Sequence, residues 1–118
     1  MPAFWLWADD DLFTDGGKLA KELKAVIKRV ASQEPGPKKP IPEDDVWVYI
    51  IGVPFGENVT VMWNYHTKEG RDADWETRVS NAAAPAIREV FLKHGAPKNI
   101  RVGVDGEPLD PARGGLAE

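Results

Sequence analysis

Apolar residues along this chain follow two spacings, one typical of strands and one typical of amphipathic helices. Compact or alternating apolar runs predict four strands, over residues 3–7, 46–51, 59–65 and 100–104. The run over 46–51 is apolar at every position, which predicts a strand that is buried on both faces. A spacing of three and four residues predicts two helices, over residues 18–32 and 74–94.

Each predicted helix has one apolar face. The first helix has lysines on its other face, and its apolar positions are Leu19, Leu23, Val26, Ile27 and Val30. The second has a stripe made of Trp75, Val79, Ala82, Ala83, Ala86, Ile87, Val90 and Phe91. Pro85 lies inside the second helix, and because proline has no amide hydrogen it should kink or split that helix.

The order strand–helix–strand occurs twice, over residues 2–52 and 58–105, and residues 106–118 are expected to be a C-terminal tail. This order predicts a single α+β domain, a two-layer α/β sandwich of two consecutive β-α-β units. Its four-stranded mixed sheet would carry both helices on one face. The other face would be apolar, and a second subunit is the simplest cover for it. A ferredoxin-like α+β domain, with a different strand order, is an alternative.

Composition narrows the function classes. The 118 residues have a net charge of -4, whereas nucleic-acid-binding domains are usually basic. No apolar run approaches the length that spans a bilayer, and the chain has no cysteine for disulfides or thiolate metal sites. We therefore expect a cytoplasmic protein with no nucleic-acid partner and no membrane association.

No metal site is expected. His66 and His94 lie too far apart in the sequence to share a spacing that suits zinc. Asp9, Asp10 and Asp11 form an acidic run that resembles a solvated turn more than a cation site.

The start of the chain resembles the tautomerase superfamily. Met1-Pro2 is followed directly by the strand over residues 3–7 and by the doubled β-α-β order, so the likeness covers residues 2–105. The superfamily includes 4-oxalocrotonate tautomerase, 5-carboxymethyl-2-hydroxymuconate isomerase, malonate semialdehyde decarboxylase and macrophage migration inhibitory factor. The resemblance implies that Pro2 becomes a catalytic N-terminus once Met1 is removed. It also implies a homotrimer with active sites near the subunit boundaries and no cofactor.

The chemistry of such an amine is independent of the resemblance. An α-amino group has a reference pKa near neutrality, and an apolar pocket or nearby cations lower it further. A neutral secondary amine can then take a proton from a carbon next to a carbonyl. It can also attack a carbonyl and form an iminium.

Several cations are candidate partners for Pro2. The resemblance places Lys39, before Pro40, at the pocket edge, and Arg101 where a related branch has a pocket tyrosine. It places Lys68 and Arg71 on a loop where the decarboxylase branch has arginines. His66 ends the preceding strand and is a candidate second acid or base. An arginine in such a pocket can bind a carboxylate through two hydrogen bonds.

Two departures from the family pattern bear on the substrate. The early arginine of the 4-oxalocrotonate tautomerase branch matches the stretch 11–13 here, and its second arginine matches a position close to Trp47. Neither arginine is present, so the resemblance does not imply a dicarboxylate muconate substrate. The expected pocket is instead aromatic, with four candidate lining residues, Trp5, Trp47, Trp63 and Tyr65.

Two hypotheses follow. The first is a cofactor-free tautomerase or isomerase acting on a small keto or enol acid, with Pro2 moving the proton and Arg101 and Lys39 polarising or anchoring the substrate. Decarboxylation and hydration use the same amine and stay open. The second is a non-catalytic oligomeric binding module on the same fold, in which Pro2 is only structural.

Overall fold

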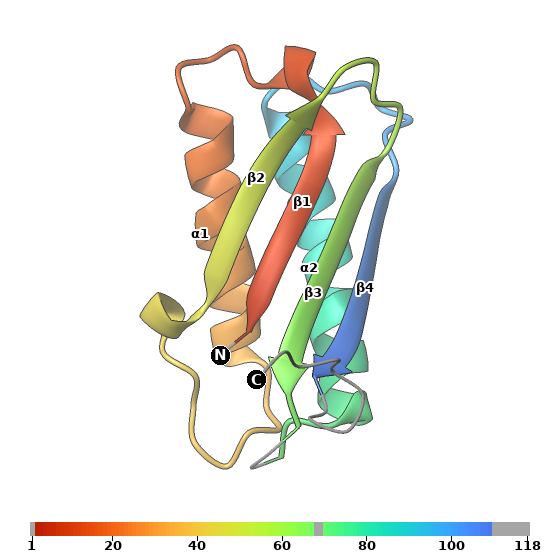
Figure 1. Cartoon of the computed structure of the whole chain (residues 1–118). Coiled ribbons are helices and arrows are strands. Elements are labelled where there is room, and N and C mark those ends of the chain that lie inside the picture. The colour runs from red at the N-terminus through yellow and green to blue at the C-terminus, as the bar shows by residue number, and fades with distance from the viewer. Residues whose placement is uncertain (1, 68–69, 110–118) are drawn as a thin grey trace, which may run out of the picture.

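The computed structural model describes residues 2–67 and 70–109. Within them the chain forms four strands and two long helices in the predicted order (Figure 1). The elements are β1 (Ala3–Asp9), α1 (Lys18–Gln33), β2 (Trp47–Val53), β3 (Val59–His66), α2 (Ala73–Lys93) and β4 (Val102–Leu109), with short 3₁₀ turns at Asp10–Leu12 and Glu43–Asp45.

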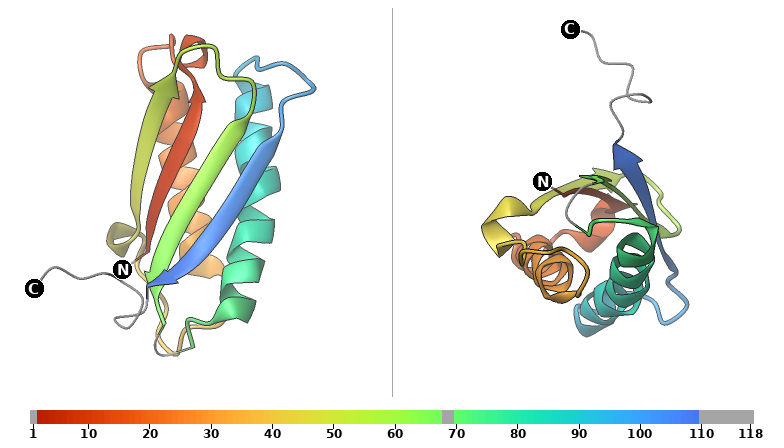
Figure 2. Two further views of the ribbon diagram at one scale, coloured as in Figure 1. Left: turned by 45° about the vertical axis from the view of Figure 1, so that its right-hand side comes forward. Right: turned by 90° about the horizontal axis from the view of Figure 1, so that it is seen from below.

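The strands form one mixed sheet in the order β2-β1-β3-β4. β1 is parallel to β2, β3 is parallel to β4, and the two central strands β1 and β3 are antiparallel. Both helices cover one face of the sheet (Figure 2), so the predicted two-layer α+β sandwich is confirmed. In a ferredoxin-like split β-α-β unit another strand separates the two parallel strands. Here β1 and β2 are direct neighbours, so the ferredoxin-like alternative is wrong.

Two details differ from the prediction. α2 runs without a break through Pro85; this proline is exposed, and water can satisfy the carbonyl that its missing amide hydrogen leaves free. β4 continues to Leu109, four residues into the segment expected as a tail, because it pairs with β3 as far as the His66–Leu109 pair. Pro108 is tolerated there because β4 is an edge strand.

The core lies between the sheet and the helices. β3 alternates as predicted and turns Val59, Val61, Trp63 and Tyr65 inward, all at most 2% exposed. The Trp63 ring stacks on Phe4 with their centroids 4.8 Å apart. Its Nε1 donates a hydrogen bond to Ser80 Oγ at 2.9 Å, which ties β3 to α2.

The other face of the sheet carries large apolar side chains that none of the described helices covers. Trp47 is 50% exposed, and Tyr49 and Met62 are each 44% exposed. Trp5 is half-buried and stacks on Tyr49, with ring centroids 5.6 Å apart. The prediction that residues 46–51 are buried on both faces is therefore wrong for the single chain, because both helices pack on the same side.

The strand directions give the sheet two distinct ends. β1 and β2 begin where β3 and β4 finish, and we call this the Pro2 end; it lies at the bottom of Figure 1. β1 and β2 finish where β3 and β4 begin, and we call this the Arg101 end.

Candidate functional site

Pro2 is buried directly before β1 at the Pro2 end. Its carbonyl oxygen accepts a hydrogen bond from the Trp47 amide at 2.9 Å, which fixes the start of β1 against β2. In the antiparallel register Ala3 lies opposite Asn64, so Pro2 lies across from Tyr65 on the helix-facing side of the sheet. The proline is thus held in a defined position at the end of a central strand.

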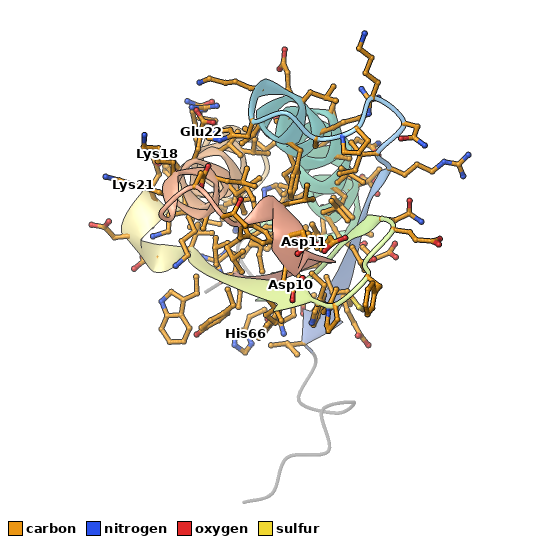
Figure 3. The ribbon with its side chains drawn as sticks, turned by 90° about the horizontal axis from the view of Figure 1, so that it is seen from above. Asp10, Asp11, Lys18, Lys21, Glu22 and His66 are labelled. Carbon is orange, nitrogen blue, oxygen red and sulfur yellow. The ribbon has the colours of Figure 1, made fainter. Side chains whose placement is uncertain are left out.

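Four more candidate residues lie at the same end. Lys39 is exposed on the connection from α1 to Trp47, the first residue of β2. His66 is exposed at the end of β3, on the side of the sheet away from the helices (Figure 3). Arg71 is on the connection from β3 to α2. The topology therefore gathers Pro2, Lys39, Trp47, His66 and Arg71 at one end, although they are far apart in the sequence. Lys68 lies outside the described residues.

Arg71 is the cation with the most unusual surroundings. Its Nε and Nη1 atoms are buried and have no hydrogen-bond partner in the described part of the chain. The adjoining connections pack tightly, since a Cβ on Gly70 would overlap the Gly36 carbonyl oxygen. Burying guanidinium donors without an acceptor is costly. A carboxylate binds an arginine through Nε and Nη2 or through Nη1 and Nη2, so a carboxylate at Arg71 would pair one of these two atoms with Nη2. By contrast, Arg78 donates from Nε and Nη2 to the Pro35 carbonyl oxygen at 3.2 and 2.8 Å.

Trp63 and Tyr65 are core residues, which differs from the prediction that they line a pocket. The Tyr65 hydroxyl donates to Glu76 Oε1 at 3.0 Å. Two causes raise the pKa of the Tyr65 phenol far above its ordinary value: burial, which has the larger effect, and the hydrogen bond to the Glu76 carboxylate. This hydroxyl is therefore not an acid near neutral pH. The aromatic candidates that remain accessible are Trp5 and Trp47, on the open face of the sheet.

Arg101 lies at the other end of the sheet, one residue before β4. Its carbonyl oxygen accepts from the Val59 amide at 2.8 Å. About seven residues of strand, roughly 20 Å, separate this end from Pro2. Arg101 lines a cavity of about 530 Å³ whose other walls include Asp9, Glu57 and Ile100. Within one chain, Arg101 and Pro2 therefore do not share a site.

The Arg101 end also carries an exposed aromatic residue that no sequence pattern marks as functional. Phe55, between β2 and β3, is 94% exposed and has a φ of 56°, which is a rare conformation for a bulky side chain. The only signal in the sequence was an aromatic residue between two turn formers, in Pro54-Phe55-Gly56.

The acidic run forms a turn. Asp9 Oδ1 accepts from the Asp11 amide at 3.0 Å and so caps the 3₁₀ turn at Asp10–Leu12. The three carboxylates have oxygens within 4.8 Å of one another, an arrangement that the turn itself explains. Among the described residues, no helix has both the length and the apolar character needed to cross a membrane.

Known proteins resemble this chain in structure. No protein-family model matches the sequence, and no curated protein matches it. Solved structures do match. A fused 4-OT, solved as an asymmetric trimer, has 13% identity and a TM-score of 0.62, over 90% of this chain and 86% of that one. A 5-carboxymethyl-2-hydroxymuconate delta-isomerase has 17% identity and a TM-score of 0.55, over 100% and 87%.

A third similar structure is Pt0534 inactivated by 2-oxo-3-pentynoate, with 18% identity and a TM-score of 0.58 over 98% of this chain and 91% of that one. At sequence identities of 13% to 18%, the similarity to these structures establishes a shared fold and nothing more. It extends over nearly the whole chain, and it includes the β-α-β repeat that follows Met1-Pro2. The chain therefore has the fold of the tautomerase superfamily, as the resemblance in its sequence predicted.

Proposed function

We propose that this protein is a cofactor-free tautomerase or isomerase that moves a proton on a small keto or enol acid, with Pro2 as the general base and acid. The supporting observation is that Pro2 is buried at the end of the sheet where Arg71 has two buried donors without an acceptor. A base and a carboxylate-binding group at one end of a tautomerase fold suit this reaction. The structures of this fold named above include a 4-OT and an isomerase.

In the proposed reaction, the substrate carboxylate binds the Arg71 guanidinium. The neutral Pro2 amine takes a proton from the carbon next to the substrate carbonyl, and the electron pair of that C–H bond moves through carbon to the carbonyl oxygen. Lys39 is the group proposed to stabilise the enolate oxygen. The resulting ammonium of Pro2 then returns the proton to oxygen or to another carbon. An isomerase and a tautomerase differ only in where this proton returns.

The proposed site is completed by a second subunit. Arg101 is at the far end of its own sheet, so it reaches a Pro2 amine only if that amine belongs to another copy. A contact between opposite ends of two copies is heterologous, and it stops growing only when it closes into a ring. We take that ring to be a homotrimer, and the fused 4-OT of the same fold is itself a trimer. The aromatic open face of each sheet would be covered in the same assembly.

The Arg101 end offers an anchor for such a contact. Both ends of the sheet carry charges of both signs, because Lys98 and Arg101 share an end with Asp9 and Glu57, and the turn Glu43–Asp45 shares an end with Lys39 and Arg71. Phe55 projects from the Arg101 end on a tightly packed loop. A Cβ on Gly52 would come within 2.9 Å of Asp10, and one on Gly56 within 2.9 Å of Asp9. A rigid, exposed aromatic residue is a typical anchor of a protein interface.

The assembly is tested by sedimentation equilibrium. We expect three times the mass of one chain, and a shift to smaller species when Phe55 is replaced by Ser. Thr77→Ala, an exposed position on α2, is the control and should leave the mass unchanged. A wild-type mass of one chain at the concentration used for activity assays would contradict the trimer.

The function is tested by locating a covalent adduct. 2-Oxo-3-pentynoate is an electrophilic keto acid, and the Pro2 amine should add to its alkyne carbon while the amine proton moves to the neighbouring carbon. We expect mass spectrometry to find one molecule of the acid per chain, on Pro2. A chain that keeps a residue before Pro2 should carry no adduct on Pro2, because the Pro2 nitrogen is then an amide without a basic lone pair.

Equal labelling of both forms, or labelling confined to lysines, would remove the catalytic proposal. The non-catalytic oligomeric module would then be the better account of this fold. The cytoplasmic location expected from the sequence stays a prediction.

A further inference from the structure

His94 links the two helices at the Arg101 end. It directly follows α2, and both nitrogens of its ring face carboxylate oxygens that come from the beginning of α1 or just before it. Nδ1 lies 3.0 Å from Asp15 Oδ2, and Nε2 lies 2.8 Å from Glu22 Oε2. The imidazole side chain is 19% exposed. The contact joins residues 79 and 72 positions apart in the chain.

This geometry selects one protonation state. Both nitrogens donate only when the ring carries two protons, as an imidazolium. A neutral ring has one N–H group. The lone pair of its other nitrogen would then point at a lone pair of a carboxylate oxygen, and the two would repel each other. Histidine changes its charge within the physiological pH range. The contact between the two helices therefore depends on a proton.

The two carboxylates that face the ring also have other partners. From α2, Lys93 Nζ lies 2.7 Å from Glu22 Oε1. Asp15 also accepts from the Leu19 amide, at 3.2 Å to Oδ1 and 3.1 Å to Oδ2, and so caps the first turn of α1. The ring lies at the carboxyl end of α2, where the helix dipole favours a cation. Lys18 and Lys21 are on the side of α1 away from α2 (Figure 3).

We propose that His94 is a protonation-dependent clamp that holds the beginning of α1 to the end of α2. With the ring doubly protonated, two carboxylates and two cations balance in one cluster. When the ring loses a proton, one carboxylate loses its donor and the cluster has a net negative charge. Loss of this contact would detach the connection over residues 94–101 from α1. This connection leads from α2 to β4 and includes Arg101. This inference does not depend on whether Pro2 is catalytic.

The two carboxyl groups of the clamp make the stability of the fold depend on pH. The backbone amide of Leu19, and then His94, lower the pKa of Asp15. Hydrogen bonds from Lys93 and then His94 lower the pKa of Glu22. A carboxyl with a lowered pKa stabilises the fold above its unfolded-state pKa, and this contribution is lost as the pH falls through the acidic range. The contacts of the ring need N–H donors on both of its nitrogens. The clamp is therefore complete only when the ring has two protons and both carboxylates are ionised.

The test is urea unfolding of the full chain between pH 5.5 and pH 8.5, and we compare the wild type with His94→Gln. We expect the unfolding equilibrium constant of the wild type to rise about threefold more than that of the variant over this range, the scale of exposed charge pairs. His66→Gln removes the other, exposed histidine and should follow the wild type. Parallel pH profiles for wild type and His94→Gln would overturn the clamp.

Nitrogen-15 NMR of the wild-type ring gives an answer even if the variant does not fold. At pH 5.5 we expect both ring nitrogens of His94 to be protonated, with scalar couplings across the hydrogen bonds or slowed exchange of both N–H protons. A single neutral tautomer at that pH would overturn the proposal.

Discussion

A chain that keeps a residue before Pro2, where the proposed enzyme has lost Met1, should have a lower kcat/KM for ketonisation of a phenylenolpyruvate-type enol. The expected loss is about 10²- to 10⁴-fold, the usual contribution of a general acid–base group. The added peptide bond turns the Pro2 nitrogen into an amide, which has no basic lone pair. Pro2→Ala keeps an amine at the N-terminus, but a primary and more mobile one, so its loss should be smaller. The measurement is the decay of the enol absorbance.

A second proline supplies the control for this prediction. Pro85→Ala changes an exposed residue within α2, far along the chain from β1, and should leave kcat/KM within twofold of the wild type. If the extended chain is as active as the wild type, the reaction does not use the Pro2 nitrogen.

Trp63→Ala should destabilise the fold by about 3–5 kcal/mol, the range for removing a large aromatic side chain from a core. The ring is 2% exposed and contacts Phe4, Tyr65 and Trp75, with centroids 4.8, 5.2 and 5.4 Å away. Because these neighbours belong to three different elements, they cannot all close on the space left by the indole. Guanidinium chloride unfolding, followed by circular dichroism, measures the change.

The hydrogen bond of Trp63 can be separated from its packing. Ser80→Ala keeps the indole but leaves its buried Nε1 without an acceptor, which should destabilise by about 1–3 kcal/mol. A Trp63→Ala variant that loses less than about 1 kcal/mol would mean that the stack between β3 and α2 is not a main support of the fold.

Local pattern predicted much of this fold because each element depends on residues close in sequence. The alternation over residues 59–65 placed Trp63 and Tyr65 on the same side of one strand. The pattern does not show which side of the strand faces the helices, so it cannot distinguish these two core residues from residues that line a pocket. In the run over 46–51 every position is apolar, so periodicity does not indicate which face of the strand is buried. Trp47 and Tyr49 are exposed only because both helices pack on the opposite face.

For the candidate site, too, the sequence pattern does not show where residues lie relative to one another. Its residues were chosen from the sequence by type and by resemblance, and strand direction then separated them. Pro2 and Arg71 lie at one end of the sheet, because β1 begins where β3 finishes, while Arg101 lies at the other end. The two unpartnered N–H groups of Arg71 are buried by tertiary packing, which no local pattern records.

By itself, then, the sequence determined the elements, their order and the proline before the first strand, because helix and strand periodicity and turn chemistry act over a few residues. Only the tertiary structure decided which strands are neighbours, which end of the sheet each charge occupies and which apolar face stays open. Those properties arise from pairing between distant segments, such as His94 with Asp15 and Glu22. Such pairings depend on the packing of the whole chain, which the spacing of residues along one segment does not contain.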